Sequence, residues 1–141
     1  MRWPAFSQTT GYALKTLSIL CASKDEWKRA EDISRETGIP ANYLSKILNQ
    51  LRKRGVVVGR KGWGGGFRLE DSARKLTILK VVEIFEGRVD FDTCVFGLTE
   101  CNQEKPCSMH EHWAPVKQAF TKMLNKVAIG DICGKRNATS K

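Results

Sequence analysis

The chain has 141 residues, 41% of them hydrophobic, which is the size and composition of one ordinary globular domain. With 28% charged residues and only 4 prolines, it is neither disordered nor collagen-like. The longest apolar stretch, residues 12–22, is interrupted by Lys15 and is too short to cross a bilayer. We therefore expect no membrane partner and a cytoplasmic location.

The positive charge is concentrated in the first part of the chain. The net charge is +9, and residues 1–88 hold 17 basic and 9 acidic side chains, whereas residues 89–141 hold 7 and 6. Such an excess attracts a polyanion, and nucleic acid is the predicted partner. The five cysteines, an odd number, favour metal binding or redox sensing over a disulfide framework.

The first predicted helix follows Thr9 and Thr10, either of which could be its N-cap. Apolar residues recur after them at the spacing of one helical face, from Ala13 to Cys21. Cys21 is therefore expected to face the core.

A helix-turn-helix is predicted for the next part of the chain. A short helix over residues 29–37 ends at Gly38, and Pro40 then requires a turn. A third helix follows over residues 41–51, with its leucines and Ile47 on one face, and Gly55 closes it. In such motifs the second helix lies in the major groove of DNA, although any αα-hairpin shares the pattern.

A β-hairpin is predicted directly after this motif. Residues 56–58 are valines, residues 60–66 form a basic, glycine-rich turn, and residues 67–69 alternate like a returning strand. This turn is not a nucleotide-binding loop, because no helix follows it and it lacks a Gly-Lys-Ser/Thr ending. Helix, turn, helix and hairpin together predict a winged helix.

The third predicted helix, which would be the recognition helix, and the hairpin, which would be the wing, carry basic side chains and no acidic ones. Seven basic residues and no acidic one occur in residues 46–69, which is typical of a phosphate-contacting surface. Residues at the start of the helix are expected to reach base edges, whereas the later basic residues are expected to hold phosphates. The tryptophan at the wing tip could pack on the sugar-phosphate edge or brace the hairpin. The predicted DNA contacts are Asn42, Tyr43, Ser45, Lys46, Arg52, Lys53, Arg54, Arg60, Lys61 and Trp63.

A loop with three cysteines follows a short helix that Thr77 is predicted to cap and that ends at Gly87. Cys94, Cys101 and Cys107 could converge on one centre, with His110 nearby. Thiolates select iron-sulfur clusters or zinc, and the wide spacing favours a [2Fe-2S] or [4Fe-4S] cluster, with zinc as the alternative.

The last long helix is expected over residues 112–129. Ser108 and Glu111 form a capping-box pattern before it, and Pro115 predicts a kink after the first turn. Five apolar residues are spaced 3, 4, 3 and 4 apart, which suits either a dimer seam or packing on the chain's own domain. They are Trp113, Val116, Phe120, Met123 and Val127.

The chain thus divides into four predicted parts. They are a DNA-binding domain at 1–88, a cluster-binding loop at 89–111, a dimerisation helix at 112–129 and a flexible tail at 130–141. Cys133 in that tail is expected to be an exposed, incidental thiol.

With these motifs in place, the sequence resembles the Rrf2 family of bacterial transcription regulators. The resemblance rests on Thr-Gly-Tyr-Ala-Leu-Lys at 10–15, Ile-Pro-Ala-Asn-Tyr-Leu at 39–44, Gly-Trp-Gly-Gly-Gly-Phe-Arg-Leu at 62–69 and the three-cysteine loop. It implies a winged helix with a long dimerisation helix, mainly α with a small β-hairpin. It also implies a cluster on Cys94, Cys101 and Cys107.

The fourth ligand varies among the proteins that this chain resembles. Some use an acidic residue in the first helix, where this chain has Gly11, which cannot ligate. Others use a histidine three residues after the last cysteine, which makes His110 the expected ligand. Gln8 or a residue of a second subunit are the alternatives.

The leading hypothesis is a homodimeric repressor that reads a pseudo-palindromic operator in double-stranded DNA. Its affinity for DNA would depend on an iron-sulfur cluster that senses iron, redox state or nitric oxide. Two alternatives stay open, namely a winged-helix regulator with a zinc or thiol-oxidation site, and a small electron-transfer protein. An enzyme is not expected, because the chain shows no Ser-His-Asp set, carboxylate pair or nucleotide loop.

Overall fold

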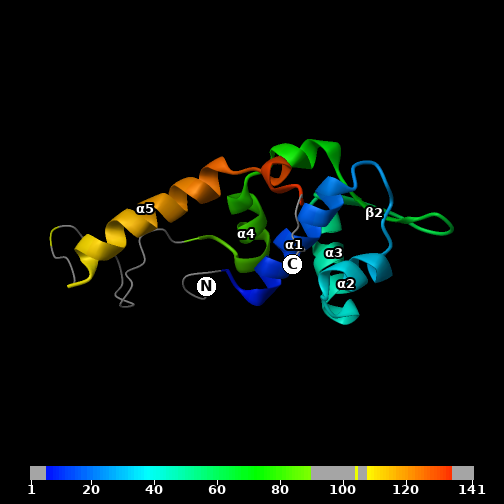
Figure 1. Ribbon diagram of the computed structural model, residues 1–141, viewed down its shortest axis with the longest axis horizontal. Helices are drawn as coiled ribbons and strands as arrows, with labels where there is room; N and C mark the ends of the chain where they lie inside the picture. Colours follow the sequence, from blue (N-terminus) through cyan, green and yellow to red (C-terminus); the bar gives the residue numbers. More distant parts are fainter. Residues whose placement is uncertain (1–5, 90–103, 105–107, 135–141) are drawn as a thin grey trace.

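The structure is a computed structural model and describes residues 6–89, 104 and 108–134. It confirms a mainly helical chain with one small antiparallel hairpin (Figure 1). In chain order the elements are α1 (Gln8–Ala22), α2 (Ala30–Thr37), α3 (Ala41–Lys53), β1 (Val57–Arg60), β2 (Gly66–Leu69), the 3-10 helix η1 (Asp71–Lys75), α4 (Ile78–Glu86), α5 (His110–Lys126) and the 3-10 helix η2 (Ile129–Ile132).

The helix-turn-helix consists of α2 and α3, which pack against α1. Gly38 ends α2 with a φ of 79°, a left-handed conformation that glycine adopts without strain. Leu44, Leu48 and Leu51 of α3 are fully buried in a core that also holds Leu17 of α1. The apolar stripe read from the sequence therefore fixes which face of α3 points away from the protein.

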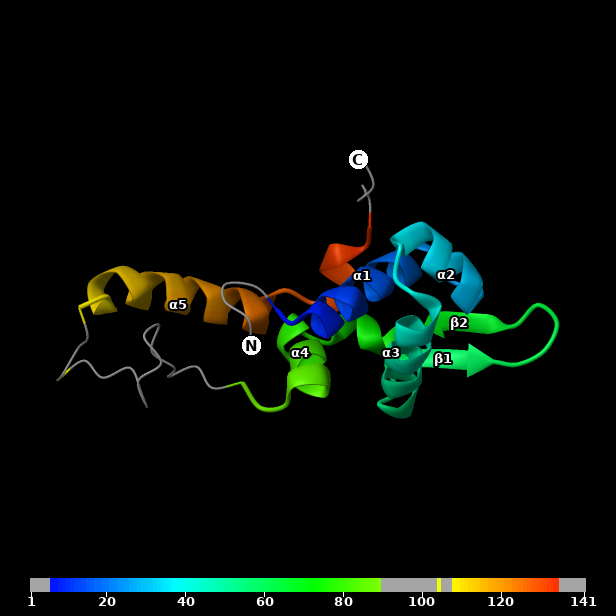
Figure 2. The ribbon, with the colours of Figure 1, turned by 90° about the horizontal axis from the view of Figure 1, so that it is seen from below.

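The wing is the hairpin of β1 and β2, which extends beyond the helices (Figure 2). Its register pairs Val57 with Leu69 and Arg60 with Gly66. Lys28, from the segment between α1 and α2, forms an isolated bridge with Phe67 and borders β2. A Cβ on Gly66 would lie 2.5 Å from the carbonyl oxygen of Lys28, so this close approach of two backbones requires glycine.

Two helix caps differ in how well the sequence predicted them. Thr77 caps α4 as expected, its side chain accepting a hydrogen bond from the Lys80 amide. For α1 the expected caps Thr9 and Thr10 are wrong, because the helix begins earlier and Ser7 is its N-cap. The Ser7 side chain accepts a hydrogen bond from the Thr10 amide, so Thr10 provides the donor rather than the cap.

α5 is one continuous helix that contains Pro115. The expected capping box is wrong, because Met109 occupies the N-cap position and no side chain caps the helix. The helix is continuous through Pro115, and the kink expected there stays a prediction. Pro115 is the sixth residue of α5, so its missing N–H leaves only the carbonyl of Glu111, in the exposed first turn, without its usual donor.

The chain after α5 packs on the DNA-binding domain instead of forming a tail from residue 130. Ile129 of η2 is fully buried in the main core, and the amide of Gly134 donates to the carbonyl of Ser18 in α1. Cys133 is bonded to Cys21 in a disulfide, so its expected role as an exposed, incidental thiol is wrong. Cys21 does face the core, as predicted.

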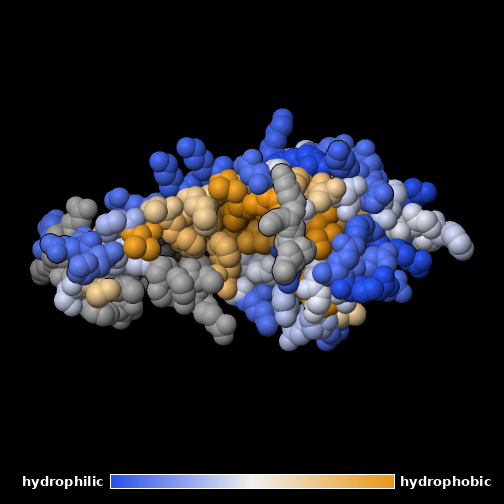
Figure 3. All heavy atoms as spheres, viewed as in Figure 1, coloured by the Kyte–Doolittle hydropathy of each residue, from blue (hydrophilic) through white to orange (hydrophobic). Residues whose placement is uncertain are grey.

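α5 and the wing lie at opposite ends of the molecule (Figure 1). A second, smaller hydrophobic cluster joins α4 to the end of α5 through Ile78, Val82 and Leu124. Hydrophobic residues gather over α4 and the adjoining part of α5, whereas hydrophilic residues dominate toward the wing (Figure 3). None of the described helices is long and apolar enough to cross a membrane.

Candidate nucleic-acid interface

The first turns of α3 present polar side chains to solvent. Asn42, Tyr43, Ser45 and Lys46 are all exposed, because the buried face of the helix is occupied by its leucines and Ile47. Tyr43 is 49% exposed, and its ring meets that of Tyr12 edge to face, with centroids 6.2 Å apart. Packing on α1 therefore orients Tyr43 while its outer edge stays available to a ligand.

Basic side chains continue from the end of α3 into the wing. The residues predicted to hold phosphates, Arg52, Lys53, Arg54, Arg60 and Lys61, are all exposed. Among the described residues, their only side-chain hydrogen bond is from Arg52 to the Oδ1 atom of Asn49, at 2.7 Å, and none forms an ion pair. Their charge is therefore not neutralised by the described part of the protein and is available for phosphates.

The tip of the wing ends in Trp63, whose side chain is 100% exposed. A fully exposed tryptophan has no packing role in the described structure, so the expectation that it braces the hairpin loses support. The turn is tight, because a Cβ on Gly65 would clash with the carbonyl of Arg60. Trp63 is thus held out from the protein on a constrained turn.

Trp27 contacts the arginines of the wing, a role that was not predicted from the sequence. The guanidinium carbon of Arg68 lies 4.8 Å from the centroid of the Trp27 ring, and that of Arg60 lies 5.4 Å away. These are cation–π distances. An aromatic residue within the basic run Trp27-Lys28-Arg29 was the available signal, but only the bridge from Lys28 to Phe67 brings that run beside the wing.

The four predicted metal ligands are only partly within the described structure. Cys94, Cys101 and Cys107 lie outside the described residues, and among the described residues no group of three or more His, Cys, Asp or Glu side chains could hold a metal ion. His110 is the first residue of α5 and is half-buried. Whether the three cysteines and His110 lie close enough to share a metal centre therefore stays a prediction.

The five residues predicted to form a dimer seam separate into two groups. Phe120 and Val127 pack on the small cluster of their own chain, where the ring of Phe120 lies 5.8 Å from that of Phe6. Val116 and Met123 are 46% and 41% exposed, and Trp113 is half-buried. Some of the five residues thus support packing on the chain's own domain, and others are exposed and could form a dimer seam.

A helix-turn-helix with an exposed polar reading face and a basic hairpin beside it defines a winged-helix protein of the DNA-binding class. The Rrf2 family, described as iron-dependent transcriptional regulators, matches residues 6–135. The chain belongs to this family.

Individual relatives agree with this assignment. A protein of Aquifex aeolicus, named as an HTH-type transcriptional regulator, is 32% identical over 129 residues, which is 90% of each chain. The HTH-type transcriptional regulator IscR of Photobacterium profundum is 29% identical over 86% of this chain and 70% of its own. These relatives are transcription regulators and not enzymes, in agreement with the sequence analysis.

The fold is also similar to that of a solved regulator. CymR (YrzC), the global cysteine regulator of B. subtilis, superposes with a TM-score of 0.70 over 92% of this chain and 95% of its own. The two sequences are 18% identical, so the likeness concerns the fold.

Proposed function

We propose that this protein is a homodimeric, cytoplasmic repressor whose affinity for operator DNA is controlled by an iron-sulfur cluster. The cluster would be held by Cys94, Cys101, Cys107 and His110. The observation that supports this coupling is the position of His110 at one end of α5, whose other end is bonded to the DNA-binding domain. There the Ile78 amide donates to the carbonyl of Val127, and the Ile129 amide donates to that of Leu76.

The chemistry of the donor set fits an iron-sulfur cluster. Three thiolates and one imidazole are ligands that such clusters accept, and His110 lies in the first turn of a helix, where the dipole favours negative charge. When bound, the cluster would supply sensitivity to oxidants and nitric oxide. The protein's part is to place the ligand His110 on α5. Gain or loss of the cluster would then tilt α5 relative to the two α3 helices of the dimer.

Recognition of DNA is divided between α3 and the wing in this proposal. Asn42, Tyr43, Ser45 and Lys46 would contact base edges in the major groove, and the basic residues from Arg52 to Lys61 would contact phosphates. Two copies related by two-fold symmetry would read half-sites about one helical turn apart. A small rotation of one copy relative to the other would then break simultaneous contact with both half-sites.

The first experiment is purification without oxygen, followed by a visible absorption spectrum and assays of iron, sulfide and zinc. We expect a brown protein with stoichiometric iron and sulfide. Cys101→Ala should lose the colour, whereas Cys133→Ser, outside the proposed ligand set, should keep it. A colourless protein that contains zinc, or that stays free of iron after anaerobic reconstitution, contradicts the cluster and supports the zinc or thiol alternative.

The regulation is tested with DNA. Duplexes selected by the protein from a random pool should share a pseudo-palindromic sequence, and their affinity should change at least about tenfold when nitric oxide destroys the cluster, a coupling of about 1.4 kcal/mol. Equal affinity of the loaded and cluster-free proteins would rule out sensing while leaving DNA binding intact.

The dimer is tested on the exposed face of α5. Met123→Glu places a charge where an apolar seam is proposed, and we expect it to shift the protein from dimer to monomer in analytical ultracentrifugation. Gln118→Glu, also on an exposed position of α5, is the matched control and should remain dimeric. A monomeric parent protein would overturn the proposed dimer.

A further inference from the structure

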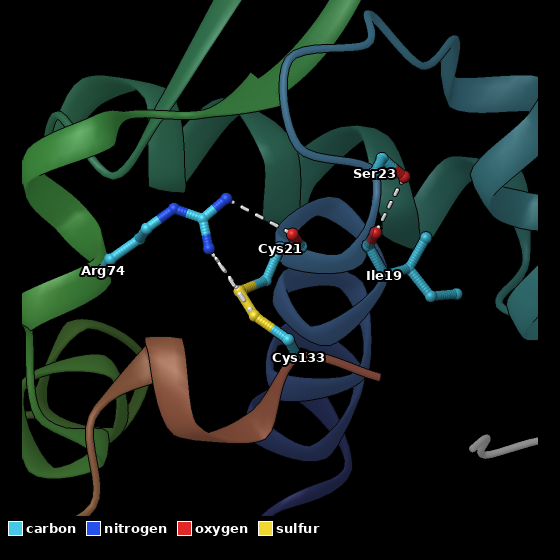
Figure 4. The surroundings of a disulfide bond; sticks show 5 residues. All are labelled: Ile19, Cys21, Ser23, Arg74 and Cys133. Carbon is cyan, nitrogen blue, oxygen red and sulfur yellow. Dashed lines mark hydrogen bonds between the residues drawn. A yellow bond between two sulfur atoms is a disulfide. The ribbon is translucent and has the colours of Figure 1, made fainter. Parts of the chain in front are cut away.

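A second sulfur site, which uses none of the three loop cysteines, lies between α1 and the segment after η2. Cys21, near the end of α1, and Cys133, which follows η2, form a disulfide between residues 112 positions apart (Figure 4). Their Cα atoms are 5.0 Å apart, within the range of roughly 4.4 to 6.8 Å that a disulfide spans. The sequence offered no signal for this pair, because no short motif connects the two cysteines.

Arg74 of η1 points its guanidinium group at both sulfur atoms (Figure 4). Its Nη1 atom lies 3.0 Å from the Sγ atom of Cys21 and 3.6 Å from that of Cys133. Its Nη2 atom donates to the carbonyl of Cys21 at 3.3 Å, which fixes the orientation of the group. A fixed positive charge beside two sulfurs stabilises thiolates, the reactive form in disulfide exchange.

The two sulfurs differ in their access to solvent. Cys21 is 1% exposed, whereas Cys133 is only half-buried. A small reagent can therefore reach Cys133 but not Cys21. This asymmetry assigns Cys133 as the attacking thiol and Cys21 as the resolving thiol, the division of roles that disulfide exchange requires.

We propose that Cys21, Cys133 and Arg74 form a reversible thiol–disulfide site that reacts with low-molecular-weight disulfides and thiols. In the forward direction the Cys133 thiolate attacks a small disulfide, forming a mixed disulfide and releasing one small thiol. The Cys21 thiolate then attacks the Cys133 sulfur and releases the second. Two protein thiols are thus oxidised to one disulfide, and the small disulfide is reduced to two thiols that carry the two protons.

The bond joins the last described segment of the chain to the first helix. Cys133 is the C-cap of η2, and the amide of the next residue, Gly134, donates to the carbonyl of Ser18 in α1 at 3.1 Å. Closing so long a loop restricts the unfolded chain, so the oxidised protein should melt about 10 °C above the reduced one. The ratio of small disulfides to thiols around the protein would thereby set how stably the segment after α5 is attached to α1.

The test uses the full chain, first reduced and then equilibrated with oxidised glutathione. Non-reducing peptide mapping by mass spectrometry should recover one cross-linked pair, Cys21 with Cys133, and reduced glutathione in excess should release it. The thermal midpoint should rise with the cross-link. If the mapping finds only free thiols, or only cross-links among Cys94, Cys101 and Cys107, the proposal is overturned.

Variants separate this site from the loop and from the proposed cluster. Cys133→Ser should abolish both the cross-link and the dependence of the thermal midpoint on glutathione, whereas Cys101→Ser should keep both. Arg74→Gln should slow cross-linking at neutral pH roughly tenfold, and Arg74→Lys should slow it less. An unchanged glutathione dependence in Cys133→Ser would contradict the assignment. Neither DNA nor a cluster enters these measurements, so they stand apart from the proposed function.

Discussion

Trp27 lies outside the recognition helix, yet it contacts two arginines of the predicted DNA-binding surface. Its ring lies beneath the guanidinium groups of Arg60 and Arg68, and it limits the positions that these long side chains can adopt. An arginine that is held in place loses less conformational entropy when it binds a phosphate. We therefore expect Trp27 to act on DNA binding through the two arginines rather than by contact with bases.

Replacement of Trp27 tests this role directly. Trp27→Ala should weaken DNA binding about tenfold, since two cation–π contacts of about 0.5 to 1 kcal/mol each are lost. The loss should be similar for all DNA sequences, because phosphates carry no sequence information. Fluorescence anisotropy with several duplexes measures this, and Trp27→Phe, which keeps an aromatic face, should retain most of the affinity. A loss confined to one sequence would contradict the role.

Glu86 contributes to stability through its charge. Burial raises the pKa of its carboxyl, but hydrogen bonds from Thr10 and from the amide and side chain of Ser7 outweigh burial and lower the pKa below its ordinary value. A lowered pKa in the folded state stabilises the protein above the pKa of the unfolded state, and this contribution disappears as the pH falls through the folded pKa.

Glu86→Gln should therefore lower the free energy of unfolding at pH 7, by less than about 1 kcal/mol because water screens this partly exposed group. Urea unfolding of both proteins at pH 7 and at successively lower pH provides the test. The difference between them should shrink as the pH falls below about 4.3. A difference that stays constant with pH would assign the effect to packing rather than charge.

At the scale of elements, α3 and the wing expose different chemical groups, from which we predict separable tasks in DNA binding. The start of α3 exposes amide and hydroxyl groups that can distinguish bases, whereas the wing exposes point charges. Asn42→Ala should cost about 1 to 3 kcal/mol and relax the preference at one base pair, with little change in salt dependence.

Lys61→Ala should behave differently from Asn42→Ala. It should weaken binding to all sequences alike and reduce the slope of log affinity against log salt by about 1, because one phosphate contact is lost. Titrations at several salt concentrations, on the selected duplex and on a scrambled one, separate the two effects. Identical behaviour of the two variants would contradict the division of tasks.

At the scale of the molecule, the chain after α5 completes the DNA-binding domain. Ile129 is fully buried in the main core, so a chain truncated after Ala128 leaves a cavity and loses the disulfide. We expect the thermal midpoint to fall by roughly 10 °C or more. A chain truncated after Gly134, which keeps every described contact of η2, is the control. Equal midpoints for the two truncated chains would show that η2 adds no stability.

The sequence predicted what depends on local pattern. The helix-turn-helix, the wing and the cap at Thr77 follow from periodicity, glycine and threonine positions within a few residues of one another. Ser7 as the true cap of α1 was missed, because the apolar stripe does not mark how far a helix extends beyond its first apolar residue. The Cys21–Cys133 pair and the contact of Trp27 with the wing depend on tertiary packing, which no local pattern encodes.

The predicted DNA-binding surface likewise depends in part on local pattern and in part on tertiary packing. The exposure of the predicted DNA contacts on α3 follows from the apolar stripe that buries the opposite face of that helix, whereas their role in binding DNA stays a prediction. Of the predicted seam on α5, Phe120 and Val127 pack on the chain's own cluster, whereas Val116 and Met123 are exposed. The sequence could not separate the two groups, because a 3-4 spacing suits packing on the same chain and packing on a second subunit equally.

The shape of α5 gives it the mechanics of a lever. It is attached to the body of the protein near Val127 and extends for 17 residues, about 25 Å, to His110 at its far end. A tilt of about 5° at the attachment moves the far end by about 2 Å, whereas a hydrogen bond tolerates only about 0.5 Å. A displacement at the far end is thus reduced at the body while the force is multiplied, so a small force at His110 would act strongly on the junction of η1 and α4.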